Sequence, residues 1–531
     1  MKTSNYVIYF HIPETDEFYL VHGYTGAVDL ASPEAIGYLL DRVDPSHTWH
    51  TKDLGIVREA IEGRTLGPIS DDTIDMLKSR GYLTEMSSAE ELRYVEKLAG
   101  FLHNRNIKHS RPNFMIVPVY ECNLRCPYCF ETDTRVELGK LKILQNVMTE
   151  KMVDAAFTSM DVILKQRSGP EGAEKAYITL YGGEPLMLET LPMVEYIVRK
   201  GLDENYRFGA ITNAVDLDHF LHLLGPEKIG FLQITLDGPR EAHNKKRIGP
   251  RHRQGTYDRI IANMKSALKT GVRISVRFHV DYTNISQVKE LIDDLENEGF
   301  QQSENFDVYT YPIHGFHRGK STPQYPLMAI HQMQRELNPV LPGLPTLGQR
   351  GSEYTGRDSE GGNGRKLKVM VSDEGIQSKL RAYVKDKLPG LYANGMEPCA
   401  ATIGLYIFDS LWRIYTCWDT VGIAGHETGT YSPGGPVLNT MNDDWLQRSP
   451  ATIDECKQCK YAFFHFGGCA SLPIGADKSI FAPACYEFQD NFLYAGQSFF
   501  RRGLDDVLQM SGPETETQPQ PLGVNYGEAA H

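Results

Sequence analysis

Three closely spaced cysteines are the residues of this sequence with the clearest chemical potential. They lie in the segment Cys122-Asn-Leu-Arg-Cys126-Pro-Tyr-Cys129, directly after an apolar run at 114–119 that predicts a buried strand. Their spacing is too tight for disulfides among all three, and three thiolates are one ligand short of a closed tetrahedral zinc site. A four-iron cluster is normally held by four Cys, so three would leave one iron open to a substrate or cofactor. On spacing alone, a zinc loop that takes its fourth ligand from elsewhere is the alternative.

The other six cysteines gather in one window late in the chain, and none occurs at 1–121 or 130–398. This segregation indicates two metal regions in two domains. Nine is an odd number, and the sequence carries no export signal, which argues against a disulfide scaffold. The six are Cys399, Cys417, Cys456, Cys459, Cys469 and Cys485.

The elements that must position the first three thiols alternate between strand and helix. Their alternation predicts a parallel sheet with right-handed crossovers, hence an α/β fold. Sites in such sheets form at the carboxyl ends of strands, where the first three thiols fall. The expected strands are 114–119, 177–181, 208–212, 231–236, 272–280 and 306–310, and the expected helices include 148–165, 191–200 and 257–270.

The rest of the chain divides by composition into further segments. Short strands at 6–11, 18–22 and 26–29 come first, then a helix capped by Ser32 with Pro33 at its first position, and a helix from Ser70 to Gly81. We expect a module at 1–86, a linker helix at 87–112, a barrel at 113–312, a bridging region at 313–395, a cysteine-rich domain at 396–490, and a C-terminal helix with a disordered tail at 491–531. Within the bridge we expect helices near 325–336 and 376–387, and a flexible loop at 361–364.

Charge and hydropathy exclude some functions. A net charge of -13 and a pI near 5.7 argue against nucleic acid as a partner, because its binding depends on basic surface. No stretch reaches the ~18 apolar residues of a membrane helix. We expect a cytoplasmic protein with neither a nucleic-acid nor a membrane partner.

The CxxxCxxC spacing, with Tyr128 before the last Cys, resembles the radical S-adenosylmethionine (SAM) superfamily. Gly182-Gly183-Glu184-Pro resembles its GGEP motif, and Thr212-Asn213-Ala214 resembles a TNG segment with Ala where Gly is usual. The stretch from Thr235 through Asp237-Gly-Pro to Arg247 resembles its S-x-D-G-P…H-D-x-x-R run, with Asn244 in place of Asp. The resemblance implies a partial (β/α)6 TIM-like barrel with a SAM-binding [4Fe-4S] cluster on Cys122, Cys126 and Cys129. It also implies SAM contacts from Tyr128, Gly182, Gly183, Glu184, Asn213, Thr235 and Arg247.

The late cysteines resemble a SPASM auxiliary-cluster domain. The pattern Cys456-x2-Cys459-x5-His465-x3-Cys469-x15-Cys485 resembles CX2CX5CX3C…C, with His465 in place of the third Cys. Cys399 and Cys417 resemble the opening pair, with Trp412 where Gly is usual. The resemblance implies one auxiliary cluster on Cys399, Cys417 and Cys469, and a second on Cys456, Cys459 and Cys485 with His465 as candidate fourth ligand. The alternatives are a packed aromatic role for His465 and a zinc-ribbon-like site on Cys456, Cys459, Cys469 and Cys485.

Together these resemblances imply a radical SAM oxidoreductase that matures ribosomally made peptides (RiPP biosynthesis). It would form a 5′-deoxyadenosyl radical, abstract hydrogen from a precursor peptide and install a modification, expected to be an oxidative cross-link. A winged-helix-like module at 1–86 would hold the leader, and a flavodoxin or ferredoxin would supply electrons. Alternatives are sulfatase-maturase-like oxidation of a protein residue, peptide epimerisation, an N-terminal cap that only shields the barrel, and a non-catalytic metal-binding adaptor. No acid or base is assigned, although Asp237, His243 and Tyr415 lie near the motifs.

Overall fold

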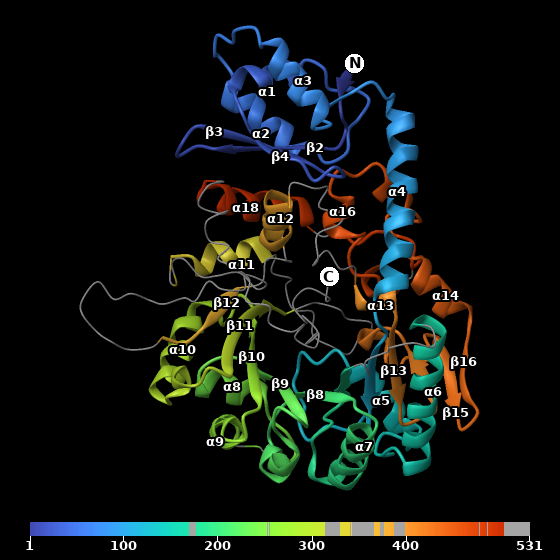
Figure 1. Ribbon diagram of the computed structural model, residues 1–531. Helices are drawn as coiled ribbons and strands as arrows, with labels where there is room; N and C mark the ends of the chain where they lie inside the picture. Colours follow the sequence, from blue (N-terminus) through green and yellow to red (C-terminus); the bar gives the residue numbers. More distant parts are fainter. Residues whose placement is uncertain are drawn as a thin grey trace.

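The computed structural model describes residues 1–168, 177–251, 253, 255–313, 330–339, 341, 366–371, 376–386, 399–476, 478–485 and 487–503. The loop expected at 361–364, the first residues of the helix expected near 325, and the expected disordered tail lie outside these ranges. Within them, an α/β sheet with its helices lies at the bottom of Figure 1, C-terminal helices lie above it, and an N-terminal module lies at the top.

The six strands predicted from alternation form a continuous parallel sheet, which confirms the α/β fold. Its strands are apolar and buried along most of their length, as parallel strands covered by helices are. The strands are β6 (Asn113–Val117), β7 (Tyr177–Leu180), β8 (Arg207–Thr212), β9 (Ile229–Leu236), β10 (Arg273–Val280) and β11 (Phe306–Pro312). The helices that share its hydrophobic core include α6 (Glu150–Ser168), α7 (Leu191–Asp203), α9 (Tyr257–Leu268) and α10 (Val288–Asn297).

The sheet extends past both ends of this six-stranded part. β12 (Val369–Val371) pairs in parallel with β11, and β13 (Leu405–Asp409) pairs in parallel with β6. Three antiparallel strands complete an 11-stranded sheet. They are β14 (Arg413–Tyr415), β15 (Gly429–Ser432) and β16 (Gly435–Leu438). The sheet therefore crosses the boundary expected at residue 396.

The N-terminal module has a three-stranded antiparallel sheet in the order β2 (Val7–Ile12), β3 (Glu17–His22) and β4 (Val28–Ala31). Ser32 caps the first helix through its side chain, as the sequence predicts, and Ser70 caps the third helix, which is expected to begin near it. The second helix was not expected. The helices are α1 (Pro33–Leu40), α2 (Lys52–Ile61) and α3 (Asp71–Ser79), and β1 (Lys2–Thr3) pairs with β5 (Leu83–Thr84).

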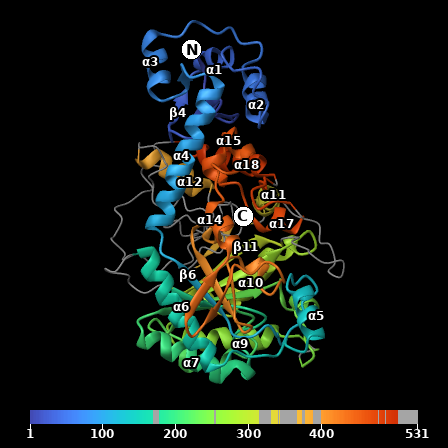
Figure 2. The same ribbon diagram turned by 90° about the vertical axis from the view of Figure 1, so that its right-hand side faces the viewer.

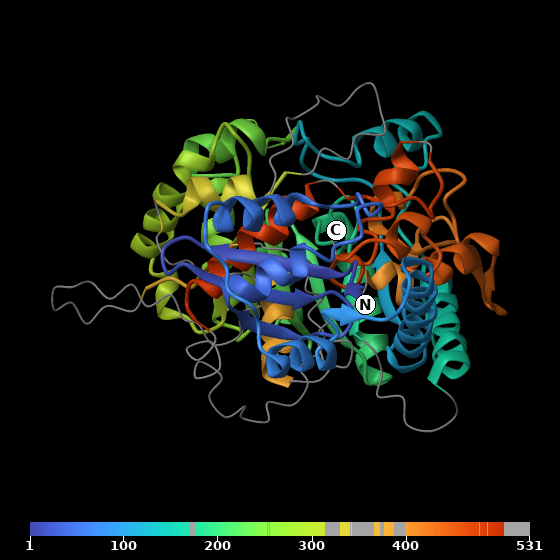
Figure 3. The ribbon, with the colours of Figure 1, turned by 90° about the horizontal axis from the view of Figure 1, so that it is seen from above.

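A long helix and a shared core attach this module to the rest of the chain. The helix α4 (Ser88–His109) begins with a capping box between Ser87 and Glu90 and runs down one side of the molecule (Figures 1 and 2). Seen from above, the module lies over the C-terminal helices (Figure 3). One aromatic contact across this boundary is Tyr19 stacked on Phe500, with ring centroids 4.4 Å apart. A single buried cluster includes side chains from both sides.

The remaining helices are short or belong to the C-terminal part. They are α5 (Thr132–Lys140), α8 (Arg240–Lys246), α11 (Ile330–Leu337), α12 (Ile376–Asp386), α13 (Ala400–Ile403), α14 (Thr440–Gln447), α15 (Asp454–Lys457), α16 (Ala462–His465), α17 (Ser471–Gly475) and α18 (Phe488–Phe500). No helix in the described part of the chain combines the length and the apolar character needed to cross a membrane.

Candidate active site

The three early thiols lie in the loop between β6 and α5. Cys122 is buried, and Cys126 and Cys129 are half-buried; all three are free of disulfides. The main-chain N–H of Leu124 donates to the Cys122 sulfur at 3.4 Å, and the N–H of Cys129 donates to the Cys126 carbonyl at 3.2 Å. Cys126 interacts electrostatically with both of the other thiols. The loop therefore brings the three sulfur atoms within electrostatic reach of one another.

This donor set is the one that the resemblance implies for an iron–sulfur cluster. Across the described residues, no group of three or more His, Cys, Asp or Glu side chains could hold one metal ion. One zinc ion draws its sulfur ligands to within about 2.3 Å, whereas a four-iron cluster takes one thiolate at each corner. Arg135 on α5 is buried and interacts electrostatically with all three thiols, so it can balance the negative charge of thiolates. Iron ligation by these cysteines stays a prediction.

The two glycines after β7 make room for the thiol loop itself. A Cβ on Gly183 would lie 2.3 Å from the Tyr120 carbonyl oxygen and 2.4 Å from that of Glu121. Gly182 has φ of +128°, and its Cβ would lie 2.7 Å from the Val119 carbonyl oxygen. The sequence interpretation, in which the glycines admit a ligand to the backbone, therefore misses their packing role. Both are needed because two stretches of main chain meet here.

Glu184 is buried and accepts three hydrogen bonds from its neighbours. Its carboxylate accepts hydrogen bonds from the Thr212 hydroxyl at 2.6 Å, the Asn213 N–H at 2.6 Å and the Leu186 N–H at 3.0 Å. Burial raises the pKa of Glu184 to about 7, although these donors oppose the shift. The Asn213 amide also donates to the Cys122 sulfur at 3.8 Å. Glu184 and Asn213 therefore lie against the thiol loop.

A second group of side chains surrounds Asp237, just after β9. The Tyr128 hydroxyl donates to Asp237 Oδ2 at 2.5 Å, and Arg247 Nε donates to the same oxygen at 3.1 Å. His279 Nδ1 lies 3.7 Å from Asp237 Oδ1, and among the described residues neither atom has a hydrogen-bond partner. Thr235 is buried at the end of β9. Buried polar atoms without a hydrogen-bond partner are uncommon in native proteins.

The geometry follows from neighbouring strand ends. β6 leads into the thiol loop, β7 into Gly182 to Glu184, β8 into Asn213, β9 into Asp237, and β10 ends just after His279. All of these strands are parallel, so their carboxyl ends meet on one edge of the sheet. Sequence reasoning assigned no role to His279 or Arg135, because neither stands at a recognisable spacing from a motif.

Two positions where the family pattern has glycine hold other residues in the left-handed conformation. Ala214 has φ of +61° and Trp412 has φ of +64°. Residues with a Cβ are strained in this region, which accounts for the glycine usual at both places. The Trp412 ring packs against Tyr431 with centroids 5.2 Å apart.

The six late cysteines form two sets in the structure. Cys399, Cys417 and Cys469 interact electrostatically with one another and with Asp419. The Ser471 hydroxyl lies 2.9 Å from the Cys469 sulfur and 2.7 Å from Asp419 Oδ2. We call these three cysteines the first auxiliary set.

The second auxiliary set comprises Cys456, Cys459 and Cys485, which also interact with one another. Membership of the two cluster sites stays a prediction, as does the zinc-ribbon-like alternative. His465 stacks on Phe488 with ring centroids 4.0 Å apart, which is the arrangement expected if His465 has a packed aromatic role. Cluster binding by either set, and iron ligation by His465, stay predictions.

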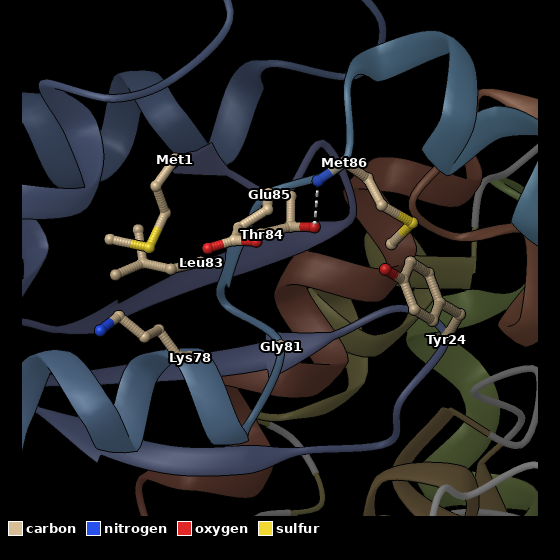
Figure 4. Close-up of a pocket in the computed structure, with 8 residues that line it drawn as sticks. All are labelled: Met1, Tyr24, Lys78, Gly81, Leu83, Thr84, Glu85 and Met86. Atoms are coloured by element: carbon tan, nitrogen blue, oxygen red, sulfur yellow. Dashed lines mark hydrogen bonds between the residues drawn. The ribbon is translucent and has the colours of Figure 1, made fainter.

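A separate pocket of about 330 Å³ lies in the N-terminal module, away from every cysteine. Figure 4 shows Lys78 and Leu83 on one side of it and Tyr24 and Met86 on the other. Its lining includes no cysteine and no histidine and one carboxylate, that of Glu85, so it is a candidate for binding rather than for chemistry.

Comparison with known proteins gives one family match and several distant likenesses. Residues 116–295 match the radical SAM superfamily. The Fe-coproporphyrin III synthase of Methanosarcina barkeri is 25% identical over 233 residues, which cover 41% of this chain and 50% of that protein. The cysteine-type anaerobic sulfatase-maturating enzyme of Clostridium novyi is 25% identical over 175 residues, 32% of this chain and 41% of that protein.

The chain thus spans half or less of the length of these curated relatives. Among solved structures, anSMEcpe with bound AdoMet and a peptide has a TM-score of 0.50 at 15% identity. The likeness covers 75% of this chain and 99% of that one, and it concerns the fold.

Proposed function

Because residues 116–295 form a radical SAM domain, we propose that this chain is a radical SAM enzyme that modifies a peptide or a residue of a protein. The observation that carries the proposal is the loop after β6, where three thiols gather at the edge of the sheet where five parallel strands end. A relative named as a sulfatase-maturating enzyme supports a polypeptide substrate.

The chemistry that a [4Fe-4S] cluster with SAM supplies here, when bound, is one-electron cleavage of SAM to a 5′-deoxyadenosyl radical that takes hydrogen from the substrate. Cys122, Cys126 and Cys129 would hold the iron, and Arg135 would balance their charge. Glu184 and Asn213 would orient the amino acid part of SAM from β7 and β8. The unsatisfied atoms of Asp237 and His279 would face the bound molecules and position them.

For the finer activity we propose an oxidative cross-link in a ribosomally made peptide. The two auxiliary sets support an oxidation, since further clusters can take an electron from the substrate after hydrogen is lost. Oxidation of a protein residue is the second candidate, favoured by the sulfatase-maturating relative. Electrons would come from an external reductant such as flavodoxin or ferredoxin.

The N-terminal module would hold the leader of the precursor peptide. In the described part of the chain, β4 pairs with β3 at the edge of its three-stranded sheet, and Leu30 on it is 54% exposed. An extended peptide can add to such an edge through main-chain hydrogen bonds. Leu30→Asp should weaken leader binding, measured by fluorescence polarisation of a labelled leader, while Lys140→Gln on the distant α5 should leave it unchanged.

The decisive experiment is anaerobic reconstitution of the full chain with iron and sulfide, followed by reduction in the presence of SAM. We expect 5′-deoxyadenosine to form, and Cys126→Ala to abolish it while the exposed Lys140→Gln retains it. Zinc in place of iron, or no deoxyadenosine from the iron-loaded chain, would refute the proposed enzyme and favour a metal-binding adaptor.

Incubation with candidate peptides then separates the finer activities. Loss of two hydrogen atoms with a new covalent link supports the cross-link, and the same loss without a link supports oxidation of a single residue. Uptake of one solvent deuterium at unchanged oxidation level would instead indicate an epimerase.

A further inference from the structure

Arg448, the residue that follows α14, is a buried cation bonded entirely to main-chain carbonyls. Its Nε donates to Ile480 at 2.8 Å, and its Nη2 donates to Gly467 at 2.9 Å and to Ala482 at 3.1 Å. Its Nη1 donates to Phe466 at 3.3 Å. The residue is 2% exposed, and in the described part of the chain it has no carboxylate partner. Burial of a charge is costly, so negative charge on neighbouring groups would stabilise this residue.

The thiols around Arg448 belong to both auxiliary sets. It interacts electrostatically with Cys399 and Cys469 of the first set and with Cys456 and Cys485 of the second. Two of the carbonyls it binds are close in sequence to these thiols, since residue 467 lies two positions before Cys469 and residue 482 three before Cys485. The guanidinium therefore lies among thiols of both sets.

We propose that Arg448 is a positioning residue shared by two auxiliary clusters, and that its charge raises the reduction potentials of both. The inference rests on the proposed function, because it requires a cluster on each set. A cluster held by thiolates gains one further negative charge when it takes up an electron. A fixed positive charge nearby in a low-dielectric interior favours that reduced state, so the potential rises.

The choice of arginine suits this position. A guanidinium presents five donors in a rigid fork, which can bind several carbonyls from different loops at once and keeps its charge when buried. Lysine would keep the charge but has three donors on a flexible stem. The charge and the hydrogen bonds can therefore be separated by substitution.

The test is a redox titration of the anaerobically reconstituted full chain, followed by electron paramagnetic resonance, with iron counted per chain. Arg448→Gln removes the charge and keeps an amide donor, whereas Arg448→Lys keeps the charge. Arg413→Gln is the matched control, because Arg413 lies on β14, four residues before Cys417, but its charge is paired with the half-buried Glu427. We expect Arg448→Gln to lower the midpoint potentials of both auxiliary clusters by at least about 59 mV. For a one-electron couple, this shift is a tenfold change in the equilibrium constant of reduction.

In the same series, the midpoint of the cluster on the early thiol loop should not move, and Arg448→Lys and Arg413→Gln should keep both auxiliary midpoints. Full iron content with unmoved midpoints in Arg448→Gln would overturn the inference and leave the proposed function intact. If Arg448→Gln loses iron, the Arg448→Lys variant decides between the two explanations. Retained iron and unchanged midpoints in Arg448→Lys would support the role of the charge. Iron loss in Arg448→Lys as well would show that Arg448 is purely structural and would overturn the inference. Wild-type protein without auxiliary iron would refute the auxiliary clusters themselves.

Discussion

Replacing Asp53 by asparagine should loosen the attachment of the N-terminal module to the loop that carries Cys456 and Cys459. Asp53 lies on α2, and its two carboxylate oxygens lie 2.6 and 2.7 Å from Nζ of Lys460, the residue after Cys459. Both side chains are buried, with exposures of 0% and 3%. The N–H of Tyr9 also donates to Asp53 at 3.0 Å, so the pair ties together α2, β2 and the cysteine loop.

The magnitude follows from the burial of this pair. Removing one partner of a buried ion pair leaves an uncompensated charge and costs about 3–5 kcal/mol. Asparagine keeps the shape of the side chain, so the loss is one of charge. At about 1.4 kcal/mol per factor of ten, opening of the module should become more frequent by roughly two to four orders of magnitude.

Hydrogen–deuterium exchange of β2 and of residues 456–460 measures this opening directly. Lys52→Gln is the matched control, because Lys52 is the neighbour of Asp53 and pairs with Asp490 across the same boundary while largely exposed. An exposed pair contributes about 0–1 kcal/mol, so exchange should hardly change. The double variant Asp53→Leu with Lys460→Met should recover most of the stability, since apolar replacement of a buried pair is often neutral. Asp53→Asn with no more effect than Lys52→Gln would refute the reasoning.

Three further outcomes can be measured on the same protein. Ala214→Gly should relieve about 1–2 kcal/mol of left-handed strain and lose about 0.8 kcal/mol of methyl burial, raising the unfolding midpoint slightly. Ala210 is buried in β8 without that strain, so Ala210→Gly should lower the unfolding midpoint. Equal shifts of the midpoint in the two variants would contradict the strain at Ala214. Burial lowers the pKa of His22 from 6.5 to about 3, so below pH 6.5 the unfolded chain binds a proton that the folded chain does not. Stability of the N-terminal module should therefore fall by up to about 1.4 kcal/mol per pH unit as pH drops through this window, and His22→Asn should flatten the slope in thermal midpoints. Glu184→Gln should weaken SAM binding by roughly 10- to 150-fold in equilibrium dialysis, the equivalent of a charged hydrogen bond, and an unchanged Kd would exclude the contact.

Local patterns in the sequence predict much of the fold. The alternation of apolar runs with amphipathic stretches identifies all six central strands, the Ser32 cap marks the start of α1, and α3 is expected to begin near Ser70. The helix α2 is missed because no cap marks its start: its N-cap Thr51 makes no side-chain hydrogen bond. Its buried face is set by contact with β2 and Lys460, which no local pattern records.

Long-range relations explain what else could not be predicted. Leu405–Asp409 is a short apolar run like many others. Its pairing with β6 depends on the fold of the chain between the two strands, which no local pattern records. The spacing of the motif cysteines indicates their chemistry, but Arg135, His279 and Arg448 reach the thiols or the site through tertiary structure alone. The packing role of Gly183 likewise depends on a second loop that approaches from β6.

The parallel pairing of β13 with β6 has a practical consequence for anyone who wishes to study the parts separately. A fragment that ends before residue 405 would leave the hydrogen-bonding edge of β6 bare, at the strand that leads into Cys122. Exposed apolar edges of this kind recruit other chains and aggregate. The early thiol loop is therefore best studied in proteins that retain the segment through β13, and insoluble shorter fragments should be read as a loss of strand pairing rather than of metal.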